Sequence, residues 1–193
     1  MNAIKISVVV FCISLMLINP LWITGTELES IPYDRLLHDS TLIAPGIGAE
    51  GILINEDVDD VLKRVGRKKY RISKPRNTGE LFGNVLKVHS KSKIYFEELY
   101  YHEDNNYTAC VFHGKVVALI GLDNNRVTLD SANLRSGINS FIYVYGKKNC
   151  FLAKSDFNAI YIYPERGIAV ADDGMNDSID LYIVFKAQTG VSK

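Results

Sequence analysis

The chain has 193 residues, of which 47% are hydrophobic and 23% charged, a balance typical of a folded globular protein rather than of a disordered one. Its 22 basic and 22 acidic residues cancel, so the sequence lacks the basic excess that marks a nucleic-acid-binding protein. The length fits one domain or two small ones.

Residues 1–25 have the pattern of an export signal. Lys5 provides a short positive region, and residues 6–18 form an apolar run that a proline and small residues follow. Cleavage near Gly25 would release the protein into the periplasm or outside the cell. An uncleaved membrane anchor is the alternative, because residues 6–23 nearly reach the ~18–20 apolar residues that a spanning helix needs.

Residues 26–51 form a lead-in segment with little periodicity, and the short apolar run after it predicts a first strand. The stretch 57–65 has apolar residues at helical spacing, acidic residues in its first turn and basic residues in its last. Gly66 closes this stretch. It therefore predicts an amphipathic helix with Asn55 or Asp57 as its N-cap.

The pattern of this helix recurs 80 positions later, and the repeat is the main clue to the architecture. Both copies have apolar residues at i, i+3, i+4 and i+7 and then a glycine: Val58, Val61, Leu62, Val65 and Gly66, and Ile138, Phe141, Ile142, Tyr145 and Gly146. Downstream, residues 98–101 align with 159–162. A unit of one helix followed by strands is thus duplicated, as repeat 1 (52–123) and repeat 2 (124–186).

Three strands are expected in each copy, joined by tight turns with Asn, Asp and Gly. They cover residues 94–102, 107–112 and 115–122 in the first copy, and 158–163, 168–171 and 178–186 in the second. The first copy is longer, and we interpret residues 73–93 as an insertion. The expected fold is α+β, with each helix packed on an antiparallel meander; whether the two meanders join in one continuous sheet is left open.

Strand alternation assigns side chains to the two faces of the expected sheet. It places Leu99, Tyr101, Ile160 and Ile162 under the helices. The opposite face then carries an aromatic-rich set: Tyr100, His102, Leu119, Tyr161, Tyr163 and Tyr182. Because Tyr is enriched at interfaces, this face predicts a binding surface for a protein or peptide partner. The alternative is that these residues are core, beneath the insertion or at the junction of the copies.

Each copy is a helix that ends at a glycine and is followed by an antiparallel meander. This duplicated unit resembles the tandem repeats of the β-lactamase inhibitory protein. It is also similar to the single-copy outer-membrane lipoproteins of the SmpA/OmlA type, which assist outer-membrane protein assembly. Residues 54–66 and 134–146 carry the resemblance, which covers about 52–185. It implies helices on one face of a sheet whose curved other face is free to hold a partner. The chain departs from the lipoproteins in having no lipobox.

Other constellations indicate no chemistry. Residues 46–51 fit G-x-G-x-x-G, but a strand is expected after the last glycine, where a dinucleotide-binding fold has a helix. Cys110 and His113 are expected to face opposite ways, which favours a packing role for the cysteine. The acidic turn 172–177 lacks the ligand spacing of an EF-hand loop, so a solvated turn is favoured over a calcium site. The pairing of Cys110 with Cys150 is left open.

The sequence therefore predicts an exported, non-catalytic protein-binding module of the cell envelope. No cofactor or metal is expected, and no nucleic acid; a membrane is a partner only if the N-terminal segment stays uncleaved. Two alternatives are a secreted or periplasmic hydrolase without a recognisable motif and a purely structural envelope protein.

Overall fold

The computed structural model describes residues 34–75, 79–81, 94–104, 106–154, 159–172 and 178–188. The chain divides into two units, Met1–Ile31 and Pro32–Lys193, and all of the described residues belong to the second. The expected export signal, most of the expected insertion and most of the acidic turn lie outside the described residues. Among the helices that are described, none has the length and apolar character that crossing a membrane would need.

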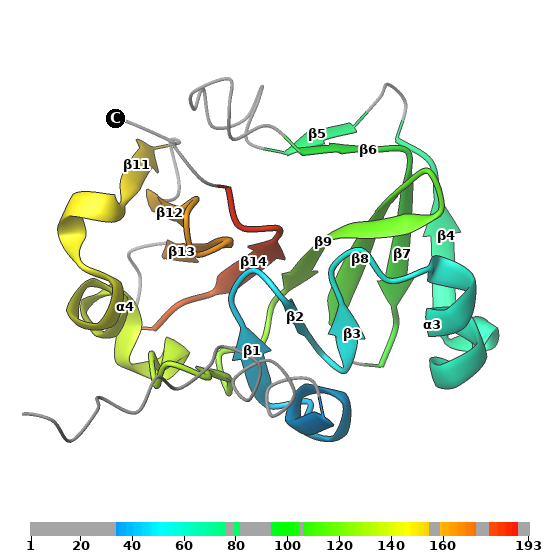
Figure 1. Ribbon diagram of the computed structural model, residues 1–193, viewed down its shortest axis with the longest axis horizontal. Helices are drawn as coiled ribbons and strands as arrows, with labels where there is room; N and C mark the ends of the chain where they lie inside the picture. Colours follow the sequence, from blue (N-terminus) through cyan, green and yellow to red (C-terminus); the bar gives the residue numbers. More distant parts are fainter. Residues whose placement is uncertain are drawn as a thin grey trace, which may run out of the picture. The chain divides into compact units, whose positions relative to one another are not determined.

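The protein is a mixed α+β structure built on an eight-stranded antiparallel sheet (Figure 1). In spatial order the strands are β11 (Phe151–Lys154), β12 (Ala159–Tyr163), β13 (Ile168–Asp172), β14 (Leu181–Phe185), β9 (Lys115–Gly121), β8 (Tyr107–Phe112), β7 (Glu98–His102) and β4 (Tyr70–Ser73). The central pair β9–β14 connects the strands expected in the first copy with those expected in the second. Apart from residues 94–96, the strands expected in the two copies therefore lie in one continuous sheet.

The two edge strands, β4 and β11, were not among the expected strands. Each comes soon after a short 3-10 turn: η1 (Arg67–Lys69) ends directly before β4, and η4 (Lys147–Asn149) ends one residue before β11. Each has four residues, too few for a period-two pattern to stand out in the sequence. Their position is set by pairing with β7 and β12, which a local pattern does not reveal.

Two smaller sheets accompany the large one. The first has the order β10 (Val127–Thr128), β1 (Leu42–Ala44), β2 (Gly48–Ala49) and β3 (Ile52–Leu53). The second pairs β5 (Gly79–Leu81) with β6 (Ile94–Phe96). The strand expected at 94–102 is thus two strands, because the chain bends at Glu97 between β6 and β7. The expected lead-in segment is also more ordered than predicted, since it supplies β1 and β2.

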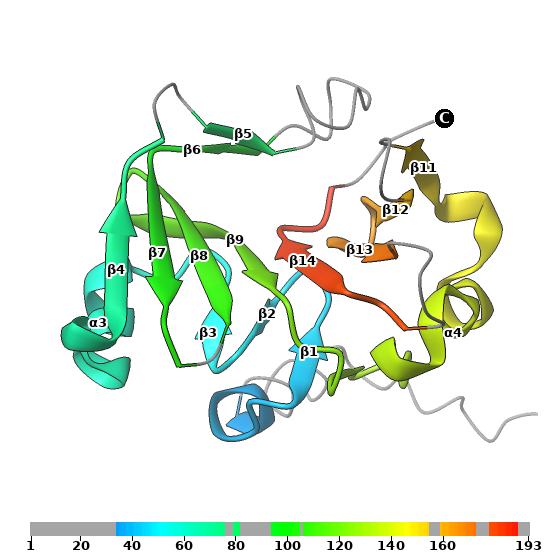
Figure 2. The ribbon, with the colours of Figure 1, turned by 180° about the vertical axis from the view of Figure 1, so that it is seen from behind.

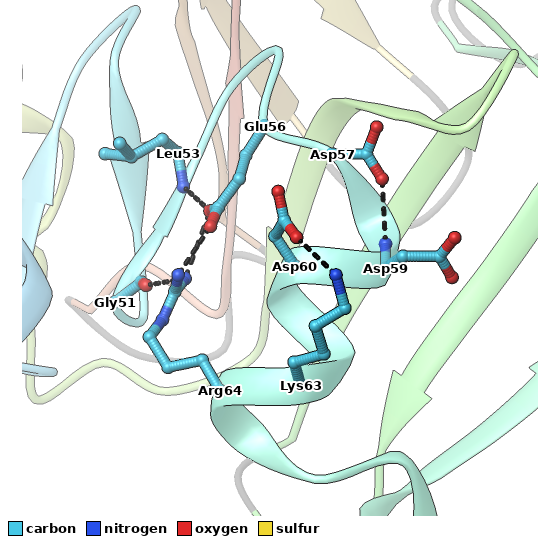
Figure 3. A network of polar contacts seen from close by, with 8 residues as sticks. All are labelled: Gly51, Leu53, Glu56, Asp57, Asp59, Asp60, Lys63 and Arg64. Carbon is cyan, nitrogen blue, oxygen red and sulfur yellow. Dashed lines mark hydrogen bonds and ion pairs between the residues drawn. The ribbon is translucent and has the colours of Figure 1, made fainter.

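The helix α3 (Val58–Val65) forms where its local signals predict it. The Asp57 carboxylate accepts a hydrogen bond from the Asp59 N–H at 3.1 Å, which makes Asp57 the N-cap. Lys63 in the last turn pairs with Asp60 at 2.9 Å (Figure 3). Gly66 ends the helix with φ +101°, a conformation that favours glycine. The second helix, α4 (Gly137–Tyr145), likewise ends at a glycine with positive φ.

Glu56 ties the β2–β3 hairpin to α3. Its carboxylate accepts hydrogen bonds from the Leu53 N–H at 3.0 Å and from the guanidinium of Arg64, which also donates to the Gly51 carbonyl at 2.8 Å (Figure 3). Strands β1–β3 lie between α3 and α4 in both views (Figures 1 and 2). The two helices and these strands pack with one face of the large sheet in a single apolar cluster. That face is the main core.

Candidate binding surfaces

The residues predicted as a free binding face lie on the helix side of the sheet. They come from β7, β9, β12 and β14 and pack with α3, α4 and β1–β3. Five of them are buried, with exposed fractions between 0 and 7%: Tyr100, His102, Leu119, Tyr163 and Tyr182. The sixth, Tyr161, is partly buried against the same cluster. The expected sidedness was therefore wrong, and the alternative, that these side chains are core, describes their position.

The cover over this face explains the reversal. Ile43 of the lead-in segment and Ile52 of β3 belong to the cluster, so β1 and β3 cover the sheet face that the sequence left open. A separate feature affects the assignment along β9. Strands β8 and β9 contain a bulge: Val111 pairs with Val116, but the next residue, Cys110, pairs with Ala118. A bulge inserts one residue and shifts the alternation, so faces assigned along β9 from one end do not hold at the other.

Several of the buried tyrosines form hydrogen bonds through their hydroxyl groups inside the core. Tyr145 donates to Thr128 Oγ1 at 2.8 Å, Tyr70 and Tyr107 hydrogen-bond to each other, and Tyr100 donates to Glu98 at 2.9 Å. Burial, reinforced by Glu98, raises the pKa of Tyr100 to about 12. These hydroxyls stay protonated at physiological pH and stabilise the core rather than react.

No local pattern in the sequence indicates a buried carboxylate at Glu50. This residue and Gly51 have φ of +56° and +71° in the two-residue β2–β3 turn, a position where Asn or Asp is usual. The Glu50 carboxylate accepts hydrogen bonds from the Tyr182 hydroxyl and from Arg126 Nε at 2.9 Å. Arg126 in turn pairs with Asp123 at 3.0 Å. The Arg126 guanidinium compensates the charge of the buried Glu50 carboxylate, and the network holds the lead-in segment on the sheet.

His102 is the least satisfied polar side chain of this core. It is 1% exposed, and neither ring nitrogen has a hydrogen-bond partner among the described residues. The ring stacks on Tyr107 and meets Tyr70 edge-on, both with ring centroids 5.0 Å apart. Burial lowers the pKa of His102 despite the opposing effect of the Asp104 carboxylate. The imidazole is therefore neutral and serves as a packing group.

The opposite face of the sheet carries a second apolar cluster. Its buried members are Phe96, Cys110, Ala118, Ala153, Ile162, Ala169, Ile183 and Phe185. Strands β5 and β6 pack on it through Leu81, Ile94 and Phe96. Several side chains packed against this cluster are only partly buried, and we call three of them the aliphatic strip: Ile120, Ile160 and Leu181. Ile160 and Leu181 flank Ala171 in one cross-strand row, and Ile120 pairs with Ile183 in the next.

Cys110 and His113 do not form a catalytic pair. Cys110 is fully buried in the second cluster, and burial raises the pKa of its thiol to about 12. The His113 side chain is 73% exposed in a turn and lies 3.5 Å from the Glu97 carboxylate. Cys150 is not joined to Cys110 by a disulfide, and its thiol donates to the Phe151 carbonyl at 3.7 Å. The geometry gives Cys110 the packing role that the sequence favoured.

The remaining sequence motifs do not form a cofactor-binding or metal-binding site within the described residues. Residues 46–51 lead into β3 rather than into a helix, so they do not present the phosphate-binding turn of a dinucleotide fold. The described residues contain no group of three or more His, Cys, Asp and Glu side chains that could hold a metal ion. Within the acidic turn, residues 173–177 lie outside the described residues.

Comparison with known proteins adds little. No protein-family model and no curated protein matches the chain. Among solved structures, the chain is similar to the uncharacterized protein YfeY from Escherichia coli, with 12% sequence identity and a TM-score of 0.40 over 77% of this chain and 100% of that one. A similarity this low transfers neither fold nor function.

Proposed function

We propose that the chain is an exported, non-catalytic protein-binding module of the cell envelope. The observation that carries the proposal is the aliphatic strip. Ile120, Ile160 and Leu181 are partly exposed aliphatic side chains on one face of the neighbouring strands β12, β13, β14 and β9. Clustered apolar side chains left at a surface are typical of a site that another protein covers. The export part of the proposal rests on the apolar run in residues 1–25.

The arrangement of the strip indicates the kind of partner. Ile160 and Leu181 both pair with Ala171, so two aliphatic side chains flank a small residue in one cross-strand row. The partner we propose is therefore a folded protein that presents a complementary apolar patch.

We infer in addition that the two halves of the chain are duplicated helix-plus-meander units. What supports this is the order of elements. Each of α3 and α4 ends at a glycine, continues through a 3-10 turn and enters an edge strand. Three further strands follow in each half, β7–β9 and β12–β14, and the halves meet at the β9–β14 pair.

The test is affinity capture of the tagged full-length chain after cross-linking in its own cells. The wild type is compared with Leu181→Asp, which introduces a charge into the strip, and with Ile160→Thr, which introduces a polar group. Tyr143→Ser is the matched control, because Tyr143 lies on α4 and is 88% exposed. Circular dichroism of each purified variant checks that the fold is intact.

The proposal requires an envelope protein that the wild type and Tyr143→Ser recover and the two strip variants lose. The purified candidate must then bind the purified chain directly, with the same ranking of variants. Equal recovery by all four proteins, or direct binding that ignores Leu181→Asp, would refute the strip as the binding surface. Recovery of the chain only from the cytosolic fraction would refute export.

A further inference from the structure

Strand β11 (Phe151–Lys154) forms one end of the eight-stranded sheet, beyond β12. On an edge strand, every second residue directs its N–H and C=O away from the neighbouring strand, where they are available to another chain. Leu152, in the middle of this edge, is 51% exposed. Exposed aliphatic side chains on an edge strand are a liability unless something pairs with the strand.

A pocket of about 370 Å³ lies beside this edge. It is lined by Ile142, Lys147, Cys150, Phe151, Leu152 and Tyr161, and we call it the edge pocket. Phe151 pairs with Ile162 and Leu152 with Tyr161, so the two neighbours in β11 direct their side chains to opposite faces of the sheet. A pocket lined by both of them lies along the strand edge rather than over one face.

The rim of the pocket is basic. Lys147 lines it, and Lys148, the next residue of η4, is exposed. The other lining side chains are apolar or aromatic, apart from the Tyr161 hydroxyl and the Cys150 thiol. The pocket therefore suits an apolar side chain that has a carboxylate close to it.

We propose that β11 and the edge pocket bind an extended, acidic peptide segment of another protein, which adds to the sheet as a ninth strand. This surface is separate from the aliphatic strip and takes a different kind of partner, so it goes beyond the proposed function. Main-chain hydrogen bonds to β11 supply affinity, and the pocket supplies specificity, as in other cases of strand addition.

The register follows from strand alternation. The peptide residue opposite Leu152 directs its side chain to the same face as Leu152 and Tyr161, and so into the edge pocket beside Ile142. A peptide residue two positions away lies on that same face, where a carboxylate reaches Lys147. The recognised segment thus has an acidic and an aliphatic residue at i and i+2.

The test uses a fluorescein-labelled peptide, acetyl-Thr-Asp-Thr-Leu-Thr-Val-Thr-amide, and the full chain, with fluorescence anisotropy as the readout. We expect saturable binding, and slower amide exchange in residues 151–154 when the peptide is present. Leu152→Asp and Lys147→Glu should each weaken binding by about tenfold. Replacing the peptide Asp by Lys should have a similar effect, and replacing the central Leu by Pro should abolish binding.

Two matched control variants make the same kinds of substitution at positions away from the edge pocket. Ile72→Asp alters an aliphatic residue on β4, the other edge strand of the sheet. Ile72 is 39% exposed. Lys68→Glu reverses an exposed charge in η1, the turn before β4. Both should bind the peptide within about twofold of the wild type, a change that corresponds to less than RT.

The proposal is overturned if no saturable binding occurs, if Leu152→Asp binds as the wild type does, or if Ile72→Asp loses binding equally. It is also overturned if sedimentation shows a dimer of the chain that Leu152→Asp dissociates, because a second copy would then occupy the edge. Leu181→Asp should leave peptide binding unchanged. Failure of the peptide test therefore leaves the strip proposal intact, and failure of the strip test leaves this one intact.

Discussion

Glu50 and Tyr182 are 132 residues apart in the chain and share a hydrogen bond in the core. The Tyr182 ring lies against Gly121, where an added Cβ atom would come within 2.2 Å of the ring. From this position the Tyr182 hydroxyl extends over β9 and reaches the turn between β2 and β3. The contact fastens the lead-in segment to the centre of the sheet, and it also explains why an aromatic face became core.

The first prediction concerns the hydroxyl of Tyr182. Tyr182→Phe keeps the ring and removes one donor from the buried Glu50 carboxylate, so unfolding free energy should fall by about 1–3 kcal/mol. Urea unfolding followed by circular dichroism measures the change. Tyr143→Phe, at an 88% exposed position, should alter stability by less than about 0.5 kcal/mol. Equal stability of Tyr182→Phe and wild type would contradict the structural role of this bond.

The second prediction concerns Gly121. Gly121→Ala places a methyl group where the Tyr182 ring lies, and overpacking of this kind costs about 1–3 kcal/mol. Tyr182→Ala removes the ring and makes room for the methyl group. The double variant should therefore lose less stability than the sum of the two single changes. Strict additivity would show that the ring and the glycine do not depend on each other.

Local signals in the sequence located several elements well. Asp57 and Gly66 limit α3 because an N-cap and a closing glycine act on neighbouring residues only. The turn at His113 and Gly114 lies between β8 and β9, whose ranges agree closely with the expected strands. Such features depend on the residues beside them, so one sequence is enough to find them.

The prediction of which sheet face is covered was wrong, because the cover over a face comes from residues that are distant in the sequence. Ile43, in the lead-in segment, and Ile52, in the short apolar run after it, cover the tyrosine face, and nothing in their neighbourhood indicates the strands they pack on. The residues between Cys110 and Ala118 include a bulge that the alternating pattern does not reveal. Glu50 was missed for the same reason, since its partners Arg126 and Tyr182 are far away in the chain.

The third prediction concerns the two helix cores. Leu62 is 7% exposed, so Leu62→Ala should reduce unfolding free energy by about 2–5 kcal/mol. Ile142 is its counterpart at an offset of 80 but is only partly buried at the edge pocket, so Ile142→Ala should cost less. Thermal and urea unfolding compare the two. A larger loss for Ile142→Ala than for Leu62→Ala would show that α4 packs more deeply than the structure describes.

The fourth prediction concerns pH and His102. Burial lowers its pKa in the folded state, so below a pH of about 6.5 the unfolded chain takes up a proton that the folded chain resists. This contribution to stability is present above the unfolded pKa and is lost as the pH falls, by at most about 1.4 kcal/mol per pH unit. Unfolding midpoints in urea between pH 7.5 and 5 measure how stability changes with pH.

His102→Phe is the variant to compare. It keeps a ring between Tyr70 and Tyr107 and has no proton to gain, so its stability should depend less on pH than that of the wild type over this range. Parallel profiles for the two proteins would show that His102 is protonated in the folded core without penalty, and that a partner group for its ring nitrogens exists.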